Sequence, residues 1–345
     1  MVNIVAIKSA PDHTMGLNLA VLAVLLPTWL YLIGSVAAVR RFTRRARSRP
    51  LPRERARGRV GPDPTAVSVL KPLHGDEPGL YENLRSFAEQ DYPAGQIVLG
   101  VNDAEDGALP AARALIRDLP GRDIALVVEP RARGSNRKVA NLENMLEAAR
   151  HEIIVLADSD MRVERHYLAA VTGPLRDPLT GVVTCLYKGV PNTGRWSQLG
   201  AMHINFWFLP GALVAEALGI GGGCFGATIA LRRETLDCIG GFERLRDELA
   251  DDHRIGGEVR ALGLSVVLSS YIVEARVTEP TFIALWQHEL RWARTERTVA
   301  PAGFAGARTL RCGRGSRGGA RSSRRNSHRL YPGPRRPALP AETRN

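Results

Sequence analysis

From residue 66 to residue 187 the chain alternates short apolar runs, rich in β-branched residues, with longer amphipathic stretches. Short apolar runs bounded by turn-forming residues predict buried strands, and apolar positions that recur every third or fourth residue predict helices. The predicted strands are 67–73, 96–103, 124–130, 152–158 and 181–187. The predicted helices between them are 78–90, 109–119 and 138–150. This alternation predicts an α/β fold with a doubly wound, mostly parallel sheet, in which ligands bind beyond the carboxyl ends of the strands.

A long uncharged apolar run, residues 17–39, precedes this alternation. As a helix with a rise of about 1.5 Å per residue it is long enough to cross roughly 30 Å of hydrocarbon. Its positive cluster follows the run, whereas a signal peptide carries positive residues before it, so we expect an uncleaved transmembrane helix. The positive-inside rule then places residues 1–16 outside and the chain from Arg40 onward in the cytoplasm.

Two further segments follow the alternation. Residues 204–231 are apolar but contain Pro210, Glu216 and a run of glycines, which favours an interfacial or re-entrant segment followed by a strand. A buried core helix is the alternative for this region. Residues 281–300 have helical periodicity and predict a final helix.

Charge is distributed unevenly along the chain. The net charge is +12, yet residues 40–59 and 308–345 contribute +9 and +10, so that residues 60–307 carry −7. An acidic body argues against a phosphate-backbone binding surface, and nucleic acid is not an expected partner. We interpret residues 40–63 as a basic linker that either rests on anionic headgroups or is simply solvated. The arginine-rich segment 306–345 predicts a disordered tail, and its composition is also typical of out-of-frame translation.

Acidic residues follow apolar runs at three places: Asp103 and Asp106, Asp158 and Asp160, and Asp251 and Asp252. A single Asp at a strand end usually caps a turn or a helix. Two carboxylates spaced as Asp-x-Asp repel each other unless a cation lies between them, and Mg²⁺ or Mn²⁺ binds such oxygens while keeping positions for phosphate. The glycine-rich motifs of dinucleotide and P-loop sites do not occur at the required places.

Seven segments between residues 64 and 305 occur in a fixed order: KPLHGDEPGLYENLRSFAEQDYP, VNDAED, NRKVANL, LADSDMRV, GGGCFGATIALRRETLDCIGGF, LADDHRIG and HELRWART. This set resembles processive-type family 2/21 glycosyltransferases. It is most similar to the ceramide-glucosyltransferase branch and, within it, to bacterial hopanoid-biosynthesis-associated glycosyltransferases. The resemblance implies that residues 64–305 form a Rossmann-like GT-A domain, which uses a UDP-sugar donor and a membrane-lipid acceptor at the cytoplasmic side of a bacterial inner membrane.

The resemblance also implies roles for individual residues. Asp103 matches the aspartate that contacts uridine, and Lys138 matches a lysine near the diphosphate. Asp158 and Asp160 match the pair that holds the metal and the diphosphate; ceramide enzymes have glycine at the second position, so this chain keeps the fuller metal site. Asp252 matches the catalytic base.

The last matching motif, (Q/R)-x-x-R-W, contacts the donor or the acceptor in the family. Arg291 and Trp292 match its end, whereas its first position falls on His288 because Gln287 lies one residue too early. Asp252 has a second interpretation as the cap of the helix that follows it. We expect a helix N-terminus to hold the pKa of this carboxyl down.

Together these matches imply an inverting hexosyltransferase that moves a sugar, N-acetylglucosamine in the most specific version, to a hydroxyl of a lipid such as bacteriohopanetetrol. Asp252 would take the proton of the acceptor hydroxyl, while a divalent metal and Lys138 would neutralise charge that grows on the diphosphate. Glucosylation of ceramide or a diacylglycerol is the alternative within this class. An inactive membrane-associated protein that binds a lipid or a nucleotide sugar is the alternative outside it.

Overall fold

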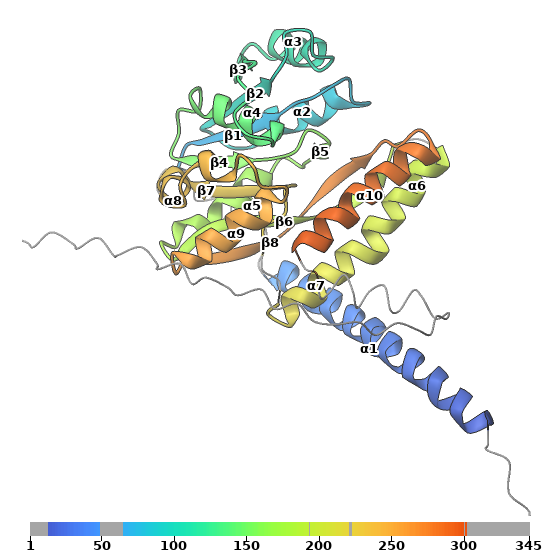
Figure 1. Ribbon diagram of the computed structural model, residues 1–345. Coiled ribbons are helices and arrows are strands. Elements are labelled where there is room, and N and C mark those ends of the chain that lie inside the picture. Colours follow the sequence, from blue (N-terminus) through green and yellow to red (C-terminus); the bar gives the residue numbers. More distant parts are fainter. Residues whose placement is uncertain (1–12, 49–64, 193, 221–222, 300, 302–345) are drawn as a thin grey trace, which may run out of the picture.

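The computed structural model describes residues 13–48, 65–192, 194–220, 223–299 and 301 (Figure 1). Its described part contains an eight-stranded sheet in the order β3-β2-β1-β4-β7-β6-β8-β5. The strands are β1 (Val67–Pro72), β2 (Gly95–Val101), β3 (Asp123–Val128), β4 (Ile153–Leu156), β5 (Met161–Arg162), β6 (Thr180–Pro191), β7 (Ile229–Arg232) and β8 (Ser265–Val277).

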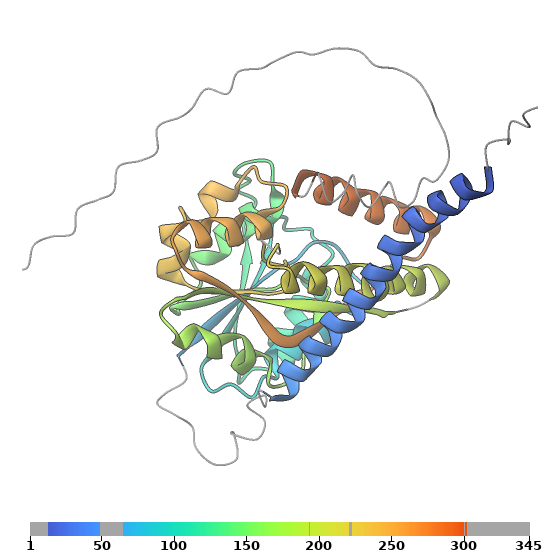
Figure 2. The same ribbon diagram turned by 90° about the horizontal axis from the view of Figure 1, so that it is seen from below.

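Helices cover both faces of this sheet and extend from one end of it (Figures 1 and 2). The α-helices are α1 (His13–Ser48), α2 (Leu80–Ala88), α3 (Leu109–Asp118), α4 (Arg137–Leu146), α5 (Tyr167–Thr172), α6 (Gly194–His203), α7 (Leu209–Ala217), α8 (Arg233–Cys238), α9 (Asp251–Ala261) and α10 (Phe282–Val299). The short helices are η1 (Gly173–Arg176), the π-helix η2 (Ile204–Phe208) and η3 (Phe242–Leu245).

The half of the sheet formed by β3, β2, β1 and β4 is parallel. Its strands and the helices α2, α3 and α4 confirm the alternation that the sequence predicts. In the other half β7 runs antiparallel to β4 and β6, so the sheet as a whole is mixed rather than uniformly parallel. Because β1, β2 and β4 are parallel neighbours, their carboxyl ends meet at one edge, and the loops that follow them are brought together there.

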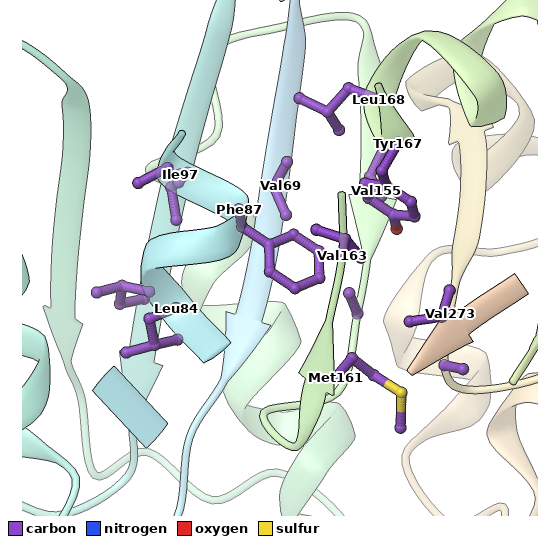
Figure 3. Close-up of a cluster of buried hydrophobic side chains, with 14 of the residues drawn as sticks. Val69, Leu84, Phe87, Ile97, Val155, Met161, Val163, Tyr167, Leu168 and Val273 are labelled. Atoms are coloured by element: carbon purple, nitrogen blue, oxygen red, sulfur yellow. The ribbon is translucent and has the colours of Figure 1, made fainter. Parts of the chain in front are cut away.

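The apolar side chains of the strands alternate between two cores. On one face, Val69 of β1 and Val155 of β4 pack with α2 and α5, where the rings of Phe87 and Tyr167 meet edge to face at 5.3 Å (Figure 3). On the other face, Leu70 of β1 packs with residues of α4 and α9. The site edge is therefore held on a sheet that is buried on both sides.

α1 contains the predicted transmembrane run 17–39 and continues past Arg40 to Ser48, so the start of the predicted basic linker is helical. Arginine and alanine favour helix, which explains the continuation. Within the described part of the chain, no helix is both long and apolar enough to cross a membrane. The remainder of the linker, residues 49–64, and the predicted tail from residue 302 lie outside the described residues.

The second apolar region is divided between η2, α7 and β7, and α7 packs against α1. The strand predicted in this region is confirmed. A buried core helix is ruled out for η2 and α7, because only Ile204 and Leu213 of these two helices are buried and Phe206 is 74% exposed. The final predicted helix is confirmed as α10, which contacts α6 (Figure 1).

Candidate active site

Lys138 links two of the three groups of aspartates that the sequence singles out. It lies in the first turn of α4, and its Nζ is 2.7 Å from Oδ1 of Asp158 in the loop after β4 and 3.8 Å from Oδ2 of Asp251 at the start of α9. Although burial disfavours its charge, Asp158 and Asp251 hold the pKa of Lys138 above its ordinary value. The lysine is thus a cation fixed between two carboxylates.

Asp252 lies in the first turn of α9 and accepts hydrogen bonds from the backbone N–H groups of Gly226 at 2.9 Å and His253 at 2.7 Å. Burial and the neighbouring Asp251 raise the pKa of Asp252 to about 6, against the opposing effect of Lys138. The expectation that the helix N-terminus would lower this pKa is wrong, because loss of solvation and a second carboxylate outweigh the helix dipole. Asp252 is also not the helix cap, since α9 begins at Asp251 and the cap residue is Ala250.

Gly226 stands where these groups meet. A Cβ added to it would lie 3.0 Å from Oδ2 of Asp158, 3.4 Å from Nζ of Lys138 and 3.5 Å from Oδ2 of Asp252. Asp158, Lys138 and Asp252 therefore surround a space that only a residue without a side chain leaves open. The structure therefore brings together three residues that the family resemblance assigns to one site.

Asp160, the second residue of the Asp-x-Asp pair, lies near two other carboxylates, those of Asp158 and Glu77. Burial, Asp158 and Glu77 together raise the pKa of Asp160 to about 7. Burial also raises the pKa of Glu77, whose Oε1 accepts a hydrogen bond from Ser159 Oγ at 3.0 Å. Three carboxylates thus lie around one turn.

Lys71, at the end of β1, supplies positive charge beneath that turn. Its side chain is fully buried, its Nζ donates to the backbone carbonyl of Asp158, and the same Nζ lies 3.9 Å from the centre of the Phe87 ring. Burial lowers the pKa of Lys71 to about 8, although Asp160, Asp158 and Glu77 favour its charged form. Lys71 therefore holds the Asp-x-Asp turn on the sheet.

The carboxylates of Asp158 and Asp160 are suitable ligands for a hard divalent cation. Burial is the main cause of the raised pKa of Asp160 and the charge of Asp158 is the next; a cation bound between the two carboxylates relieves their repulsion. No group of three or more His, Cys, Asp or Glu residues in the described part of the chain has the geometry to hold a metal alone. Two carboxylates suit Mg²⁺ or Mn²⁺ in a site where phosphate oxygens complete the coordination.

Asp103 and Asp106 follow β2 but differ in environment. Asp103 is exposed, and its Oδ1 accepts a local hydrogen bond from the Glu105 N–H at 3.0 Å. Asp106 accepts from the N–H groups of Gly75 and Ala108, both at 2.8 Å, so it closes the loop after β1 onto the start of α3. Asp103 is thus available to a ligand at the rim, whereas Asp106 is structural.

The three candidates on α10 lie in a different environment from the carboxylates. His288 pairs with Glu279, and Trp292 joins an aromatic cluster that we define as Tyr187, Phe208, Phe225 and Trp292. Tyr187 stacks on Phe208 at 4.6 Å. Arg291 precedes Trp292 on an exposed turn of the helix. Phe225 directly precedes Gly226, so the aromatic cluster borders the space beside Asp252.

Several residues of the site were not assigned by sequence reasoning. Glu77 and Gly226 carry no local signal, because their importance comes from segments that are distant in the sequence. Asn136 does carry one, since Asn immediately before an apolar helical pattern is typical of a helix N-cap. Its side chain indeed accepts hydrogen bonds from the N–H groups of Lys138 and Val139.

Among known proteins, this chain is similar to ceramide glucosyltransferases. Ceramide glucosyltransferase 1 of Caenorhabditis elegans is 26% identical over 251 residues, which cover 70% of this chain and 53% of that protein. Ceramide glucosyltransferase 3 of the same organism is 22% identical over 247 residues, which cover 68% of this chain and 51% of that protein. The chain therefore spans about half the length of these curated relatives.

Among solved structures, the mannosyltransferase PcManGT from Pyrobaculum calidifontis, in complex with GDP-Man and Mn²⁺, is 23% identical. It matches with a TM-score of 0.53 over 85% of this chain and 76% of that one. This likeness shows the fold, an α/β GT-A-like arrangement. The family described as Glycosyl transferase family 21 matches residues 26–315. Because that match covers most of the chain, the protein belongs to glycosyl transferase family 21.

Proposed function

We propose that this protein transfers a sugar from a UDP-sugar to a hydroxyl group of a membrane lipid, with inversion at the anomeric carbon. The observation that carries the proposal is the convergence of Asp158, Lys138 and Asp252 on the space beside Gly226. A carboxylate base opposite a cationic and metal-binding group is the arrangement that a single displacement at the anomeric carbon requires.

The donor is assigned to the carboxyl edge of the parallel half-sheet. Lys138 would contact the diphosphate, and Asp158 and Asp160 would hold Mg²⁺ or Mn²⁺, which supplies charge neutralisation when bound. Asp103 is assigned to the uridine. Beside it, Nδ2 of Asn102 donates to the Arg137 carbonyl at 3.0 Å, which joins the loop after β2 to the start of α4.

Asp252 is assigned as the base. Its two backbone hydrogen bonds fix the orientation of the carboxylate, and a pKa of about 6 leaves it mostly ionised near neutral pH while keeping it a better proton acceptor than an ordinary Asp. The acceptor hydroxyl would lie in the space beside Gly226. Its proton passes to Asp252 as its oxygen attacks and the bond to the diphosphate breaks.

A lipid acceptor is supported by the aromatic cluster beside the base, which suits an apolar molecule with a polar head. Ceramide is one version, favoured by the names of the curated relatives, and a diacylglycerol is an alternative to it. N-acetylglucosamine onto a hopanoid such as bacteriohopanetetrol is the more specific version, which rests on the ordered sequence motifs. His288, Arg291 and Trp292 are assigned to acceptor or donor contacts because they match the family motif. Trp292 belongs to the aromatic cluster, and the His288 ring lies 5.1 Å from the Trp292 ring between centres.

We also propose that α1 attaches the protein to the bacterial inner membrane, with the catalytic domain in the cytoplasm. Apolar side chains are exposed along one face of this helix, among them Leu26, Trp29, Leu30 and Ile33, each 60–64% exposed. The following Arg40, Arg41, Arg44 and Arg45 favour the anionic cytoplasmic leaflet.

The test uses the full chain purified in detergent and incubated with UDP-glucose or UDP-N-acetylglucosamine, Mg²⁺ or Mn²⁺, and ceramide, diacylglycerol or bacteriohopanetetrol. Mass spectrometry should detect one glycolipid whose formation stops when the metal is chelated. Asp252→Asn is the matched control and should bind UDP-sugar without forming product. Binding of UDP-sugar by the wild type with no product from any acceptor would favour the inactive-binder alternative.

A further inference from the structure

Two loops that are distant in the sequence meet along a line of hydrogen bonds, which we call the loop seam: residues 134–136 before α4 and residues 246–251 before and at the start of α9. The Ser135 N–H donates to Asp247 Oδ1 at 2.8 Å, and the Asn136 N–H donates to the Arg246 carbonyl at 2.8 Å. Gly134 has a φ of +79°, and a Cβ there would lie 2.6 Å from the Arg246 carbonyl oxygen. The two backbones are therefore in direct contact.

Asn136 lies at the centre of the loop seam and uses both ends of its amide. Its Oδ1 accepts from the N–H groups of Lys138 at 3.0 Å and Val139 at 3.2 Å, and so begins the helix that carries Lys138. Its Nδ2 donates to the Glu248 carbonyl at 2.8 Å and to Oδ1 of Asp251 at 3.4 Å. The Oδ1 end of Asn136 therefore contacts the helix that carries Lys138, and the Nδ2 end contacts the loop that leads to Asp252.

Asparagine is suited to this double task. A helix cap needs only an acceptor, which Ser, Thr and Asp also supply. Bonds to a carbonyl and a carboxylate at the same time need a donor, which Ser can supply once and Asp cannot supply when ionised. Since Asp251 and Asp252 are adjacent, loss of the two Nδ2 bonds releases the segment that positions the base.

We propose that Asn136 is a positioning residue that sets the placement of Asp252 relative to Lys138, so that the loop seam couples the donor half of the site to its base. The inference rests on the proposed function. It assigns to Asn136 a role in transfer that is separable from its role as a helix cap.

The experiment compares Asn136→Ser with Asn136→Ala in the full chain. Serine keeps the cap, but its single hydroxyl donor can replace at most one of the two hydrogen bonds from Nδ2 to Glu248 and Asp251; alanine loses the cap and both of these hydrogen bonds. We expect Asn136→Ser to bind UDP within about twofold of the wild type and to lose at least about tenfold in the rate of transfer, because small misplacements of reacting groups are costly. Alanine should lower the melting temperature further without restoring transfer.

Asn144→Ser is the matched control. Asn144 lies on the same helix, and its Nδ2 donates to two backbone carbonyls, of Glu129 and Arg131, away from the base. The control should lose stability to a similar extent and keep transfer. If Asn136→Ser transfers sugar as fast as Asn144→Ser, Asn136 is only a cap and the inference is overturned.

Should Asn136→Ser not fold, Asp247→Ala opens the loop seam at its exposed end by removing the acceptor of the Ser135 N–H. A slower transfer with unchanged UDP binding supports the inference, and wild-type transfer in this variant overturns it. Failure of the proposed function has a different signature, because the wild type itself would then form no glycolipid.

Discussion

At the scale of single residues, Asp252 combines two requirements that oppose each other. A base must be ionised to accept a proton, yet the pKa of Asp252 is raised to about 6 by burial and by Asp251. Keeping Asp252 ionised in the folded site therefore lowers the free energy of unfolding. Hydrogen bonds from two backbone N–H groups to its carboxylate offset part of this loss. The environment of Asp252 thus disfavours the ionised form that the proposed reaction requires.

The raised pKa predicts the acid limb of the pH profile. Protonated Asp252 cannot accept the hydroxyl proton, so kcat/KM for the acceptor should fall as pH drops through about 6 and should level off above about pH 7. Transfer measured between about pH 5 and about pH 8 at saturating metal tests this. A limb near the ordinary aspartate pKa would show that the environment of Asp252 does not control the reaction.

A second prediction concerns the space beside Gly226. The φ of Gly226 lies outside the left-handed region, so alanine is compatible with its backbone, but the added methyl group would lie 3.0 Å from Asp158 and 3.5 Å from Asp252. We expect Gly226→Ala to fold with a melting temperature close to that of the wild type and to lose transfer by about tenfold or more.

Gly257→Ala is the control for that substitution, because Gly257 lies in α9 one turn after the base and no atom lies within 4 Å of an added Cβ. It should keep activity and gain up to about 1 kcal/mol of stability from better helix propensity. Equal activity in the two alanine variants would contradict the assignment of the space to substrate.

At the scale of elements, the strands and helices of the parallel half were predictable because burial on both faces produces continuous apolar runs, and amphipathic helices repeat their pattern between them. The grouping of Asp103, Asp158 and Asp160 at one edge follows from parallel strand order. Asp252 reaches the same site from α9, and family resemblance rather than pattern identified it. Glu77 and Gly226 could not be assigned, because the groups that they contact come from segments that are distant in the sequence.

α10 gives a prediction about the acceptor. Trp292 of this helix contacts Tyr187 and Phe208 at 6.3 and 5.9 Å between ring centres. In detergent, Trp292→Ala should raise KM for the lipid acceptor more than KM for the UDP-sugar, and should cost about 2 kcal/mol of stability because a large half-buried ring is lost. Trp286→Ala, at a position that is 59% exposed on the same helix, should change neither KM. A change confined to KM for the UDP-sugar would place Trp292 on the donor side instead.

At the scale of the whole molecule, many of the exposed apolar residues gather on helices that extend from one end of the sheet, α1, α6, η2 and α10 among them (Figure 1). Patches of this kind on a folded protein mark contact with a membrane or a partner. A lipid acceptor reaches its site only from a membrane, so this distribution agrees with the proposed reaction.

The purified full chain should therefore float with vesicles of phosphatidylcholine and phosphatidylglycerol in a density gradient. Replacing Trp29 and Ile33 of α1, which are 61% and 64% exposed, with Asp should weaken flotation. Leu179→Asp is the control, because Leu179 is 67% exposed on the α/β body and should not contribute. Flotation that is unchanged in the α1 variant would assign the membrane contact to other helices.

The loop seam also limits how this sequence can be recombined. Residues 65–160 contain the donor half, while Asp252 and the aromatic cluster come from later in the chain, which invites chimaeras that join the first part of one relative to the second part of another. Such a hybrid would bring together residues 134–136 of one parent and residues 246–251 of the other. The two loops are complementary down to backbone contact, so a productive exchange has to carry both loops from the same parent, and natural variants in one loop should be accompanied by changes in the other.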